Sequence, residues 1–289
     1  MMARGYHQCK TAGVMTSERL DSDTVRVRWL PVGAGDAAHL TRWRGMLDAD
    51  ELTRADRYHF ASDRDTFIAA HALARAMLSD ATGLPTAIWR YVTGEFGKPS
   101  LAADCAGGGL RFNISHTRGF VACAIARDEV GVDVEASDRR TDFDIADRFF
   151  APEEAQLVKS VPPEGRACVF FRFWTLKEAF IKATGEGLRR PLDSFSFTFN
   201  PVRIVFHPER EGIPRRDNPA AWQFAEYNPA PDRPLALAIL RTTLQPLRLD
   251  AREARPEEIA PTALDEAGSV TALISRCSGT PERAPVHER

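Results

Sequence analysis

The sequence predicts an α+β protein made of two units that each run from helices to strands. In the first half, apolar residues recur at helical spacing over residues 50–81, and alternating patterns typical of strands follow over 110–135. In the second half, the helical pattern is strongest over 170–184, and strand patterns follow over 195–241. This shared order favours a duplicated unit, although no convincing sequence repeat links the two halves.

The first half is expected to hold an early strand, two helices and three later strands. Gly83 and Pro85 end the longer helix, because glycine tolerates the left-handed conformation at a helix end and proline cannot continue a helix. The three later strands follow one another closely, so we expect a small antiparallel sheet. The predicted elements are a strand over 25–30, helices over 37–47 and 50–81, and strands over 110–116, 120–126 and 129–135.

The second half repeats the order of helices before strands. Pro152 opens a helix with two glutamates in its first turn, where acidic side chains are favoured. Gly185, Gly187 and Pro191 end the strongest helix of this half. The predicted elements are helices over 143–150, from 152 onward and over 170–184, and strands over 195–199, 202–206, 222–227 and 235–241.

Composition along the chain divides it into four segments. Residues 1–22 are polar and unpatterned, so we expect a loose leader. The first α/β half is assigned to 23–127 and the second, with the candidate metal site, to 128–248. Residues 249–289 are rich in Arg, Glu, Ala and Pro, and such a composition buries too little apolar surface to offset chain entropy. This last segment is therefore predicted to be a partly disordered tail.

Bulk composition excludes several functional classes. The chain has 289 residues, of which 44% are hydrophobic and 27% charged, as in an ordinary globular protein with a real core. A formal net charge of −2 argues against nucleic-acid or membrane-surface binding, and no apolar run approaches the roughly 20 residues of a membrane helix. The five cysteines are scattered and no secretory signal precedes them, which is typical of a reducing cytoplasm.

Two acidic side chains lie next to one another on a predicted strand. Alternate residues of a strand share a face, so Asp133 and Glu135 point together while Val130, Val132 and Val134 face the core. Neighbouring carboxylates repel each other, and a hard divalent cation such as Mg²⁺ removes that cost. A solvated acidic face is the alternative, and for an isolated D-x-E it is the favoured one.

The strongest helix of the second half carries a third acid beside a lysine. Glu178 and Lys182 are four residues apart in the favoured order for an ion pair. Glu178 follows Trp174 by four residues and so borders the buried stripe instead of facing open water. A stabilising surface ion pair is the plain interpretation. The functional interpretation is a metal ligand or general base, with a lysine that neutralises phosphate. The buried stripe comprises Phe170, Phe173, Trp174, Phe180 and Ile181.

Three further sets of polar residues are weaker signals. Ser115 and His116 diverge on their strand, so they do not suit a nucleophile–base pair, and a structural histidine remains as open as a functional one. Lys98 lies in a Gly- and Pro-rich loop, Gly94–Pro99, that could present a cation to phosphate, although an ordinary turn is favoured. A basic set in the first helical region is interleaved with acids and is expected mainly to solvate a surface: Arg54, Arg57, Arg64 and Arg75.

The order of these motifs resembles that of the 4′-phosphopantetheinyl transferases, most closely the pseudo-dimeric class that activates peptide and polyketide synthases. The resemblance runs over about 25–240 and is strongest over 94–197. Agreement of several motifs in order and spacing outweighs the plain interpretation of each acid. The motifs are G-K-P, F-N-x-S-H, G-x-D-x-E and W-x-x-K-E-x-x-x-K-x-x-G-x-G-L, which start at Gly97, Phe112, Gly131 and Trp174.

The resemblance implies a fold, a cofactor and a reaction. The fold would be two similar α/β subdomains about a pseudo-twofold axis, in a monomer, with coenzyme A in the cleft between them. The reaction would be attack by a carrier-protein serine on a phosphorus of coenzyme A, with release of 3′,5′-ADP. By the same resemblance, Asp133, Glu135 and Glu178 would hold Mg²⁺, or alternatively Mn²⁺. Glu178 would be the general base and Lys182 would stabilise charge on the leaving phosphate.

Cofactor contacts are carried over position by position. Lys182 would face the pyrophosphate, Lys98 would line the adenine and phosphate pocket, and Ser115 and His116 would contact the 3′-phosphate end. Where relatives often carry an Arg-Thr pair, this chain has Thr66-Phe67, so Arg64 is a candidate substitute. The full set of implied contacts is Arg54, Arg57, Lys98, Pro99, Ser115, His116, Asp133, Lys177 and Lys182.

Two other functions compete with the transferase. A non-catalytic module that binds coenzyme A or a carrier protein would tolerate loss of an acid, yet all three acids are present. A metal-dependent nucleotide hydrolase would not require this order of motifs. The sequence leaves open which carrier protein and pathway the enzyme would serve.

Overall fold

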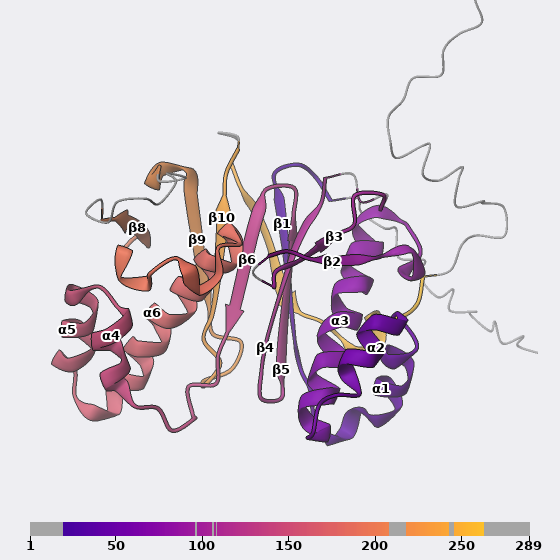
Figure 1. The fold of residues 1–289 in the computed structure, drawn as a ribbon, viewed down its shortest axis with the longest axis horizontal. Helices are drawn as coiled ribbons and strands as arrows, with labels where there is room; N and C mark the ends of the chain where they lie inside the picture. Colours follow the sequence, from indigo (N-terminus) through magenta and orange to yellow (C-terminus); the bar gives the residue numbers. More distant parts are fainter. Residues whose placement is uncertain are drawn as a thin grey trace, which may run out of the picture.

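In this computed structural model, two groups of helices flank two β-sheets that face each other at the centre of the molecule (Figure 1). None of the helices in the described ranges is long and apolar enough to cross a membrane. The structure describes residues 20–95, 97–105, 107, 109–207, 218–242 and 246–262.

The first sheet and its helices form one half of the molecule. Its strand order is β11-β1-β5-β4, with β1 (Thr24–Pro31), β4 (Arg111–Thr117), β5 (Phe120–Ala126) and β11 (Arg248–Glu253). The long helix α3 (Ala61–Thr82) packs on β4 and β5, and its buried face joins the core of this half. The remaining elements are α1 (Ala37–Arg44), α2 (Ala49–Ala55), β2 (Tyr91–Thr93) and β3 (Pro99–Leu101).

The second half has the same arrangement on the other side. Its sheet has the order β6-β10-β9, with β6 (Glu129–Val134), β9 (Trp222–Tyr227) and β10 (Leu235–Leu240). The long helix α6 (Pro163–Thr184) packs on β6 and β10 and contributes phenylalanines to an aromatic core. The remaining elements are α4 (Ala146–Phe149), α5 (Pro152–Ser160), β7 (Phe195–Thr198) and β8 (Arg203–Phe206).

A third core joins the two sheets. Val130, Val132 and Val134 of β6 are fully buried there, which confirms the predicted inward face of this strand. Val25 and Val27 of β1 meet them from the first sheet. Burial of both inner sheet faces removes apolar surface from water and holds the halves together.

Three strands of the first sheet pair in the same order as the three strands of the second, and β11 is an addition to the first sheet. Strand β1 pairs with β5 and β5 with β4, just as β6 pairs with β10 and β10 with β9. The helices α3 and α6 each have 22 residues. Each ends at a glycine in the left-handed region, Gly83 with φ 76° and Gly185 with φ 74°, which confirms both predicted helix ends.

Two predictions for the first half need correction. The helix predicted over 50–81 is two helices, α2 and α3, because the chain is extended at Phe60 between them. This break lets α2 cross α3, so that Glu51 reaches the side chains of His71 and Arg75. The strand over 129–135 was expected to join a sheet with its predecessors, but β6 begins the second sheet.

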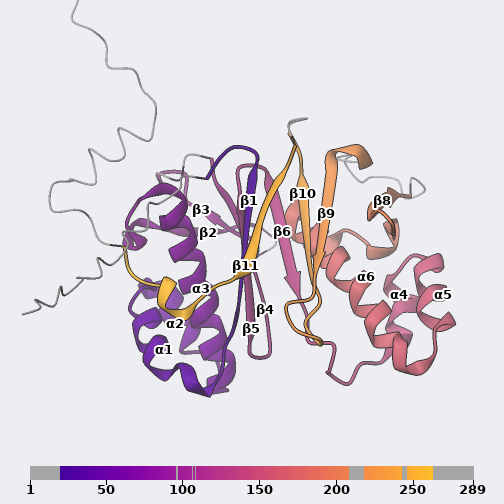
Figure 2. The same cartoon turned by 180° about the vertical axis from the view of Figure 1, so that it is seen from behind.

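The predicted boundaries are wrong at both ends of the chain. Residues 249–262 were assigned to a disordered tail, whereas β11 pairs in parallel with β1 (Figure 2). Ala254 and Ile259 are buried in the core of the first half beyond that strand. Leu20, placed in the loose leader, is 3% exposed in the same core. The rest of both predicted segments, 1–19 and 263–289, lies outside the described residues.

Candidate active site

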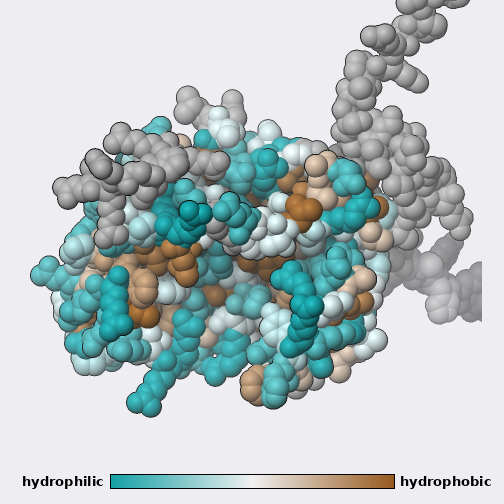
Figure 3. Space-filling view, viewed as in Figure 1, coloured by the Kyte–Doolittle hydropathy of each residue, from teal (hydrophilic) through white to brown (hydrophobic). Residues whose placement is uncertain are grey.

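A cavity of about 690 Å³ lies between the two halves and is lined by four of the predicted site residues, Lys98, Pro99, Glu178 and Lys182. Asp133 and Glu135 are not among its lining residues. The first half contributes the β2–β3 turn with Lys98 and Pro99, and Asn113 from β4. The second half contributes Glu178 and Lys182 from α6. In the view of Figure 3, apolar surface is exposed in the hollow between the halves, framed by hydrophilic side chains.

Side chains of β4 attach it to β6 where no backbone ladder joins the two strands. Asn113 Oδ1 accepts the Val132 N–H at 2.8 Å, and Ser115 Oγ accepts the Val134 N–H at 3.2 Å. Both polar residues are buried. These bonds fix the first half against the acidic strand of the second. Asn113 was not singled out from the sequence, although it stands in the F-N-x-S-H motif.

Glycine at position 131 allows the acidic strand to lie directly against α6. A Cβ at Gly131 would stand 2.0 Å from Ala179 O and 2.5 Å from Ala183 N. No side chain fits at such distances, so only glycine permits this approach. The approach brings Asp133 of β6 beside Lys182 of α6.

Asp133 is the buried centre of a small polar network. It is 3% exposed, and its Oδ1 accepts bonds from Lys182 Nζ at 2.6 Å and from Ser115 Oγ at 2.9 Å. Lys182 Nζ also donates to Ser115 Oγ at 2.9 Å. The second carboxylate oxygen of Asp133, Oδ2, is buried without a hydrogen-bond partner among the described residues. Ser115 is therefore committed to the acid cluster, which differs from the predicted contact with the 3′-phosphate.

Glu135 follows on the same face and is held by two donors. Trp174 Nε1 donates to its Oε1 at 3.0 Å, and Arg139 lies 3.4 Å from its Oε2. Burial, followed by the charge of Asp133, raises the pKa of Glu135. Trp174 was expected only to pack in the core, so its role as a donor was missed.

Glu178 has the most perturbed carboxyl group of the cleft. Burial, followed by the charge of Asp133, raises its pKa to about 7, and Lys182 opposes this rise. Glu135 adds to the repulsion. The three acids thus act on one another electrostatically. Within the described ranges, no three His, Cys, Asp or Glu side chains are arranged to hold a metal ion.

The two basic residues at the proposed cofactor end of the cleft, Lys98 and His116, differ in their surroundings. Lys98 Nζ donates to Ala183 O at 3.0 Å and lies 3.3 Å from Glu129, so it joins the loop to the end of α6. His116 is exposed on β4. Desolvation by the surrounding protein, followed by the charge of Lys182, lowers its pKa.

Lys177 is not in the cleft, and its assignment as a cofactor contact is wrong. Its side chain is fully buried, 2.7 Å from Glu154, and donates to Leu192 O and Phe195 O. The ammonium also lies 4.4 Å from the centre of the Phe195 ring. The physical reason is helical spacing, because Lys177 follows Phe173 by four residues and so shares the buried stripe.

The predicted arginine contacts do not line the cavity. Arg54 and Arg57 are exposed, and the Arg54 guanidinium stacks over Phe67 at 5.4 Å. Arg64, the candidate substitute, pairs with Asp65 at 3.3 Å. Their contact with a phosphate stays a prediction.

Arg75 was expected to solvate a surface and is instead 1% exposed. It donates to Glu51 and Asp48, each at 2.9 Å, while His71 lies 2.7 Å from the other oxygen of Glu51. Alternation with neighbouring acids concealed this buried network in the sequence.

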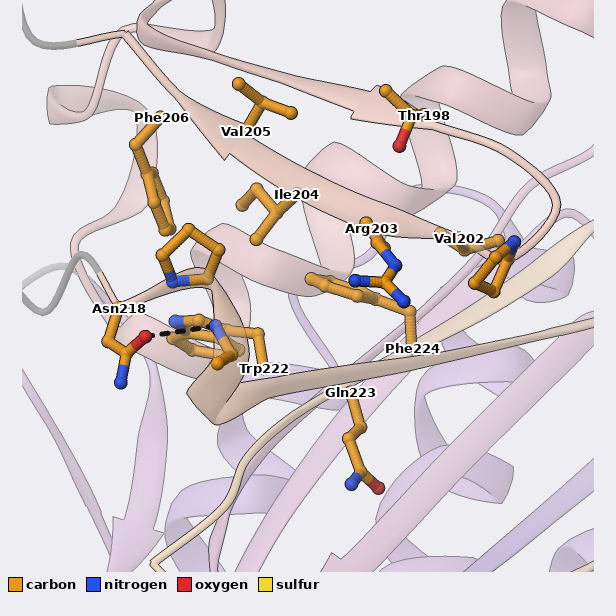
Figure 4. A pocket seen from close by; sticks show the side chains of 13 residues that line it. Thr198, Val202, Arg203, Ile204, Val205, Phe206, Asn218, Trp222, Gln223 and Phe224 are labelled. Carbon is orange, nitrogen blue, oxygen red and sulfur yellow. Dashed lines mark hydrogen bonds between the residues drawn. The ribbon is translucent and has the colours of Figure 1, made fainter.

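A larger cavity of about 1050 Å³ lies elsewhere, between β8 and β9 (Figure 4). Ile204 and Phe206 on one side face Trp222 and Phe224 on the other (Figure 4). Arg203 is the one charged side chain among the described lining residues. The described residues of this cavity therefore include no acid–base pair.

Fold and cleft together define a class: an α+β protein whose two halves enclose a cleft lined by two glutamates and two lysines. A family model described as the 4′-phosphopantetheinyl transferase superfamily matches residues 129–239. A second, described as 4′-phosphopantetheinyl transferase, N-terminal, matches residues 28–128.

Individual relatives agree with these matches. The chain is 30% identical to the 4′-phosphopantetheinyl transferase HetI of Nostoc sp. over 227 residues, which are 78% of this chain and 91% of that protein. It is 30% identical over 155 residues to Sfp of Bacillus subtilis, covering 54% of this chain and 67% of that protein. A mouse L-aminoadipate-semialdehyde dehydrogenase-phosphopantetheinyl transferase is 28% identical over 186 residues, 61% of this chain and 59% of that protein. The chain belongs to the 4′-phosphopantetheinyl transferase superfamily.

Proposed function

We propose that this protein transfers the 4′-phosphopantetheine moiety of coenzyme A to a serine hydroxyl of an acyl or peptidyl carrier protein, with release of 3′,5′-ADP. Family membership supports the reaction. The observation that carries the proposal is the position of Glu178, which lines the cleft between the two halves together with Lys182. The pKa of this carboxyl group is raised to about 7. A base with a pKa near the working pH is suited to accept a proton from serine.

The donor chemistry of the acid cluster suits a divalent cation, although the three side chains are not arranged around a common metal position in the described structure. Asp133 carries a buried carboxylate oxygen without a partner among the described residues, and the mutual repulsion of three acids is the cost that a cation removes. Oxygen ligands suit Mg²⁺, with Mn²⁺ as a substitute. Asp133, Glu135 and Glu178 would hold it. When bound, it would neutralise charge on the pyrophosphate of coenzyme A.

The protein's own residues accept the proton, stabilise the leaving group and limit access of water. Glu178 accepts the proton of the attacking serine hydroxyl. Lys182 reaches the cleft from the last turn of α6, where its ammonium stabilises charge on the leaving phosphate. Ile114 and Ile181 give part of the lining an apolar character that limits water. No nucleophile of the enzyme's own is required.

The nucleotide end of coenzyme A is proposed to lie toward the first half. Lys98 and Pro99 line that side of the cavity, and His116 continues along β4. Arg54 of α2 and Arg57, just after that helix, supply further positive charge. We propose that the matching topologies of the two halves reflect a pseudo-twofold axis, in a cytoplasmic monomer.

Intact mass measurement of an apo carrier protein tests the function. Incubation with coenzyme A, Mg²⁺ and this protein should add one phosphopantetheine group to the carrier. A carrier panel that stays unmodified while coenzyme A binds would instead support a non-catalytic binding module. Release of nucleotide without carrier modification would indicate a hydrolase.

A further inference from the structure

Lys182 occupies one oxygen, Oδ1, of the carboxylate that the proposed cation would share, while the other oxygen, Oδ2, has no hydrogen-bond partner among the described residues. Its Nζ lies 2.6 Å from Asp133 Oδ1, and the Asp133 side chain is only 5% exposed. At this distance, away from bulk water, an ion pair is weakly screened. The structure thus shows an acid cluster in which the ammonium of Lys182 is already paired with Asp133, the most buried of the three acids.

Among the three acids, Lys182 forms a direct ion pair with Asp133, and it acts on Glu135 and Glu178 through its charge alone. Glu135 has its own partners, Trp174 and Arg139. The side chain of Glu178 makes no hydrogen bond or ion pair with any other described residue. A divalent cation that enters the cluster would therefore meet the ammonium of Lys182 as a like charge at the shared carboxylate.

The side chain of Lys182 can also turn toward the cavity between the halves. Its side chain is 28% exposed, lines the cavity between the halves, and has a flexible four-carbon stem. An anionic phosphate in that cavity would attract the ammonium away from Asp133. Asp133 would stay in place after this change, because Ser115 Oγ donates to its Oδ1 at 2.9 Å and is itself anchored to the Val134 N–H.

We infer that Lys182 is an internal competitor of the divalent cation, and that it leaves Asp133 only when the pyrophosphate of coenzyme A draws its ammonium away. This inference rests on the proposed function. It makes binding of the cation and of coenzyme A cooperative, because each removes an obstacle to the other. Coupling of this kind is reciprocal, so each ligand raises the affinity for the other by the same factor.

Binding of Mn²⁺ to the full-length protein, followed by electron paramagnetic resonance, tests the inference without turnover. In the absence of coenzyme A, Lys182→Met should bind Mn²⁺ at least about tenfold more tightly than the wild type, since a close like charge is removed. The pyrophosphate itself also supplies ligands, so the measurement without coenzyme A is the decisive one. Addition of coenzyme A should tighten Mn²⁺ binding less in the variant than in the wild type.

Lys98→Met is the matched control. It removes a lysine from the same cavity, but one that pairs with Glu129 and Ala183 O instead of Asp133. Its affinity for Mn²⁺ without coenzyme A should change by less than about threefold, as for a more distant, screened charge. Lys182→Gln, which can still donate to Ser115, provides the same comparison if Lys182→Met does not fold.

Equal Mn²⁺ affinity in the wild type and the Lys182 variant would overturn the inference, as would an equal gain in Lys98→Met. The wild type's transfer to an apo carrier is measured in parallel. Transfer by the wild type together with unchanged Mn²⁺ affinity in the variant contradicts only the competition. Absence of transfer by the wild type contradicts the proposed function itself.

Discussion

Lys177 and Glu178 are neighbours in the chain, yet their side chains meet opposite surroundings. A helix turns by about 100° per residue, which sends Lys177 into the aromatic core and Glu178 into the cleft. Strand and helix periodicities placed the three acids and Lys182 on defined faces, and the order of the family-like motifs made them site candidates. Lys177 was mispredicted because it was carried over from its position in the family-like motif, whereas its spacing from Phe173 indicated burial.

The raised pKa of Glu178 makes the stability of the metal-free protein depend on pH. In the folded state this carboxyl group keeps its proton to about pH 7, against an ordinary value of 4.5. The folded state binds more protons within that window, so this group lowers stability as pH rises from about 4.5 to about 7. Thermal unfolding of Glu178→Gln should show a flatter decline over this range. A decline identical to the wild type's would show that Glu178 ionises normally.

Lys177→Met tests the buried ion pair away from the cleft. The substitution leaves Glu154 as an uncompensated buried charge, and loss of one partner typically costs about 3–5 kcal/mol. Urea unfolding should show this loss. Lys159→Met is the control, because Lys159 pairs with Asp147 at the surface and should change stability by less than about 1 kcal/mol. Equal effects of the two variants would contradict the burial of Lys177.

Contact between strand β6 and helix α6 brings Asp133 and Glu135 close to Glu178. The sequence predicted both elements and the acid faces, but not that the two would touch through Gly131. Neither did it reveal that Asn113 and Ser115 bind β6 from the other half, because such pairings depend on tertiary contacts and not on local spacing.

Gly131→Ala should force the strand and helix apart. Its Cβ would meet backbone at 2.0 Å, so we expect a loss of at least about 3 kcal/mol in the free energy of unfolding, at the upper end of overpacking costs. Gly165→Ala in the same helix meets no atom closer than 3.8 Å and should be neutral or stabilising by up to about 1 kcal/mol. Calorimetric melting compares them. A tolerated Gly131→Ala would show that the two elements are not in contact.

Strand β11 is an integral part of the first sheet. Asp250 accepts from Arg26 Nε at 3.0 Å and from Arg28 Nη2 at 2.8 Å, which satisfies two largely buried guanidinium groups. The tail was mispredicted because this charged strand has few large apolar residues. Its partners lie more than 200 positions away in the chain, beyond the reach of local patterns.

Truncation separates β11 from the residues that follow it. A chain ending at 245 loses the strand and leaves Arg26 and Arg28 without Asp250, so its thermal midpoint should fall by many degrees. A chain ending at 262 keeps every described element and should melt near the full-length protein. Equal midpoints for both truncated chains would show that β11 contributes nothing to the fold.

At the scale of the whole molecule, two topologically matched halves place different chemistry on either side of one cleft. The first half offers a lysine loop and polar strand residues, and the second offers acids and Lys182. The helix-then-strand order of both halves was visible in the sequence. Their packing through a valine-rich core between the sheets was not, because alternating strands do not show which sheet they will face.

The most direct test of the account is the rate of carrier modification by Glu178→Gln, measured by intact mass with coenzyme A and Mg²⁺. The variant keeps the shape of Glu178 and removes its charge, so the first-order transfer rate should fall by about 10²-fold or more while the protein stays folded. Calorimetry should still detect coenzyme A through contacts at its nucleotide end. Transfer at the wild-type rate by the folded variant would contradict the central claim that Glu178 is the base of this active site.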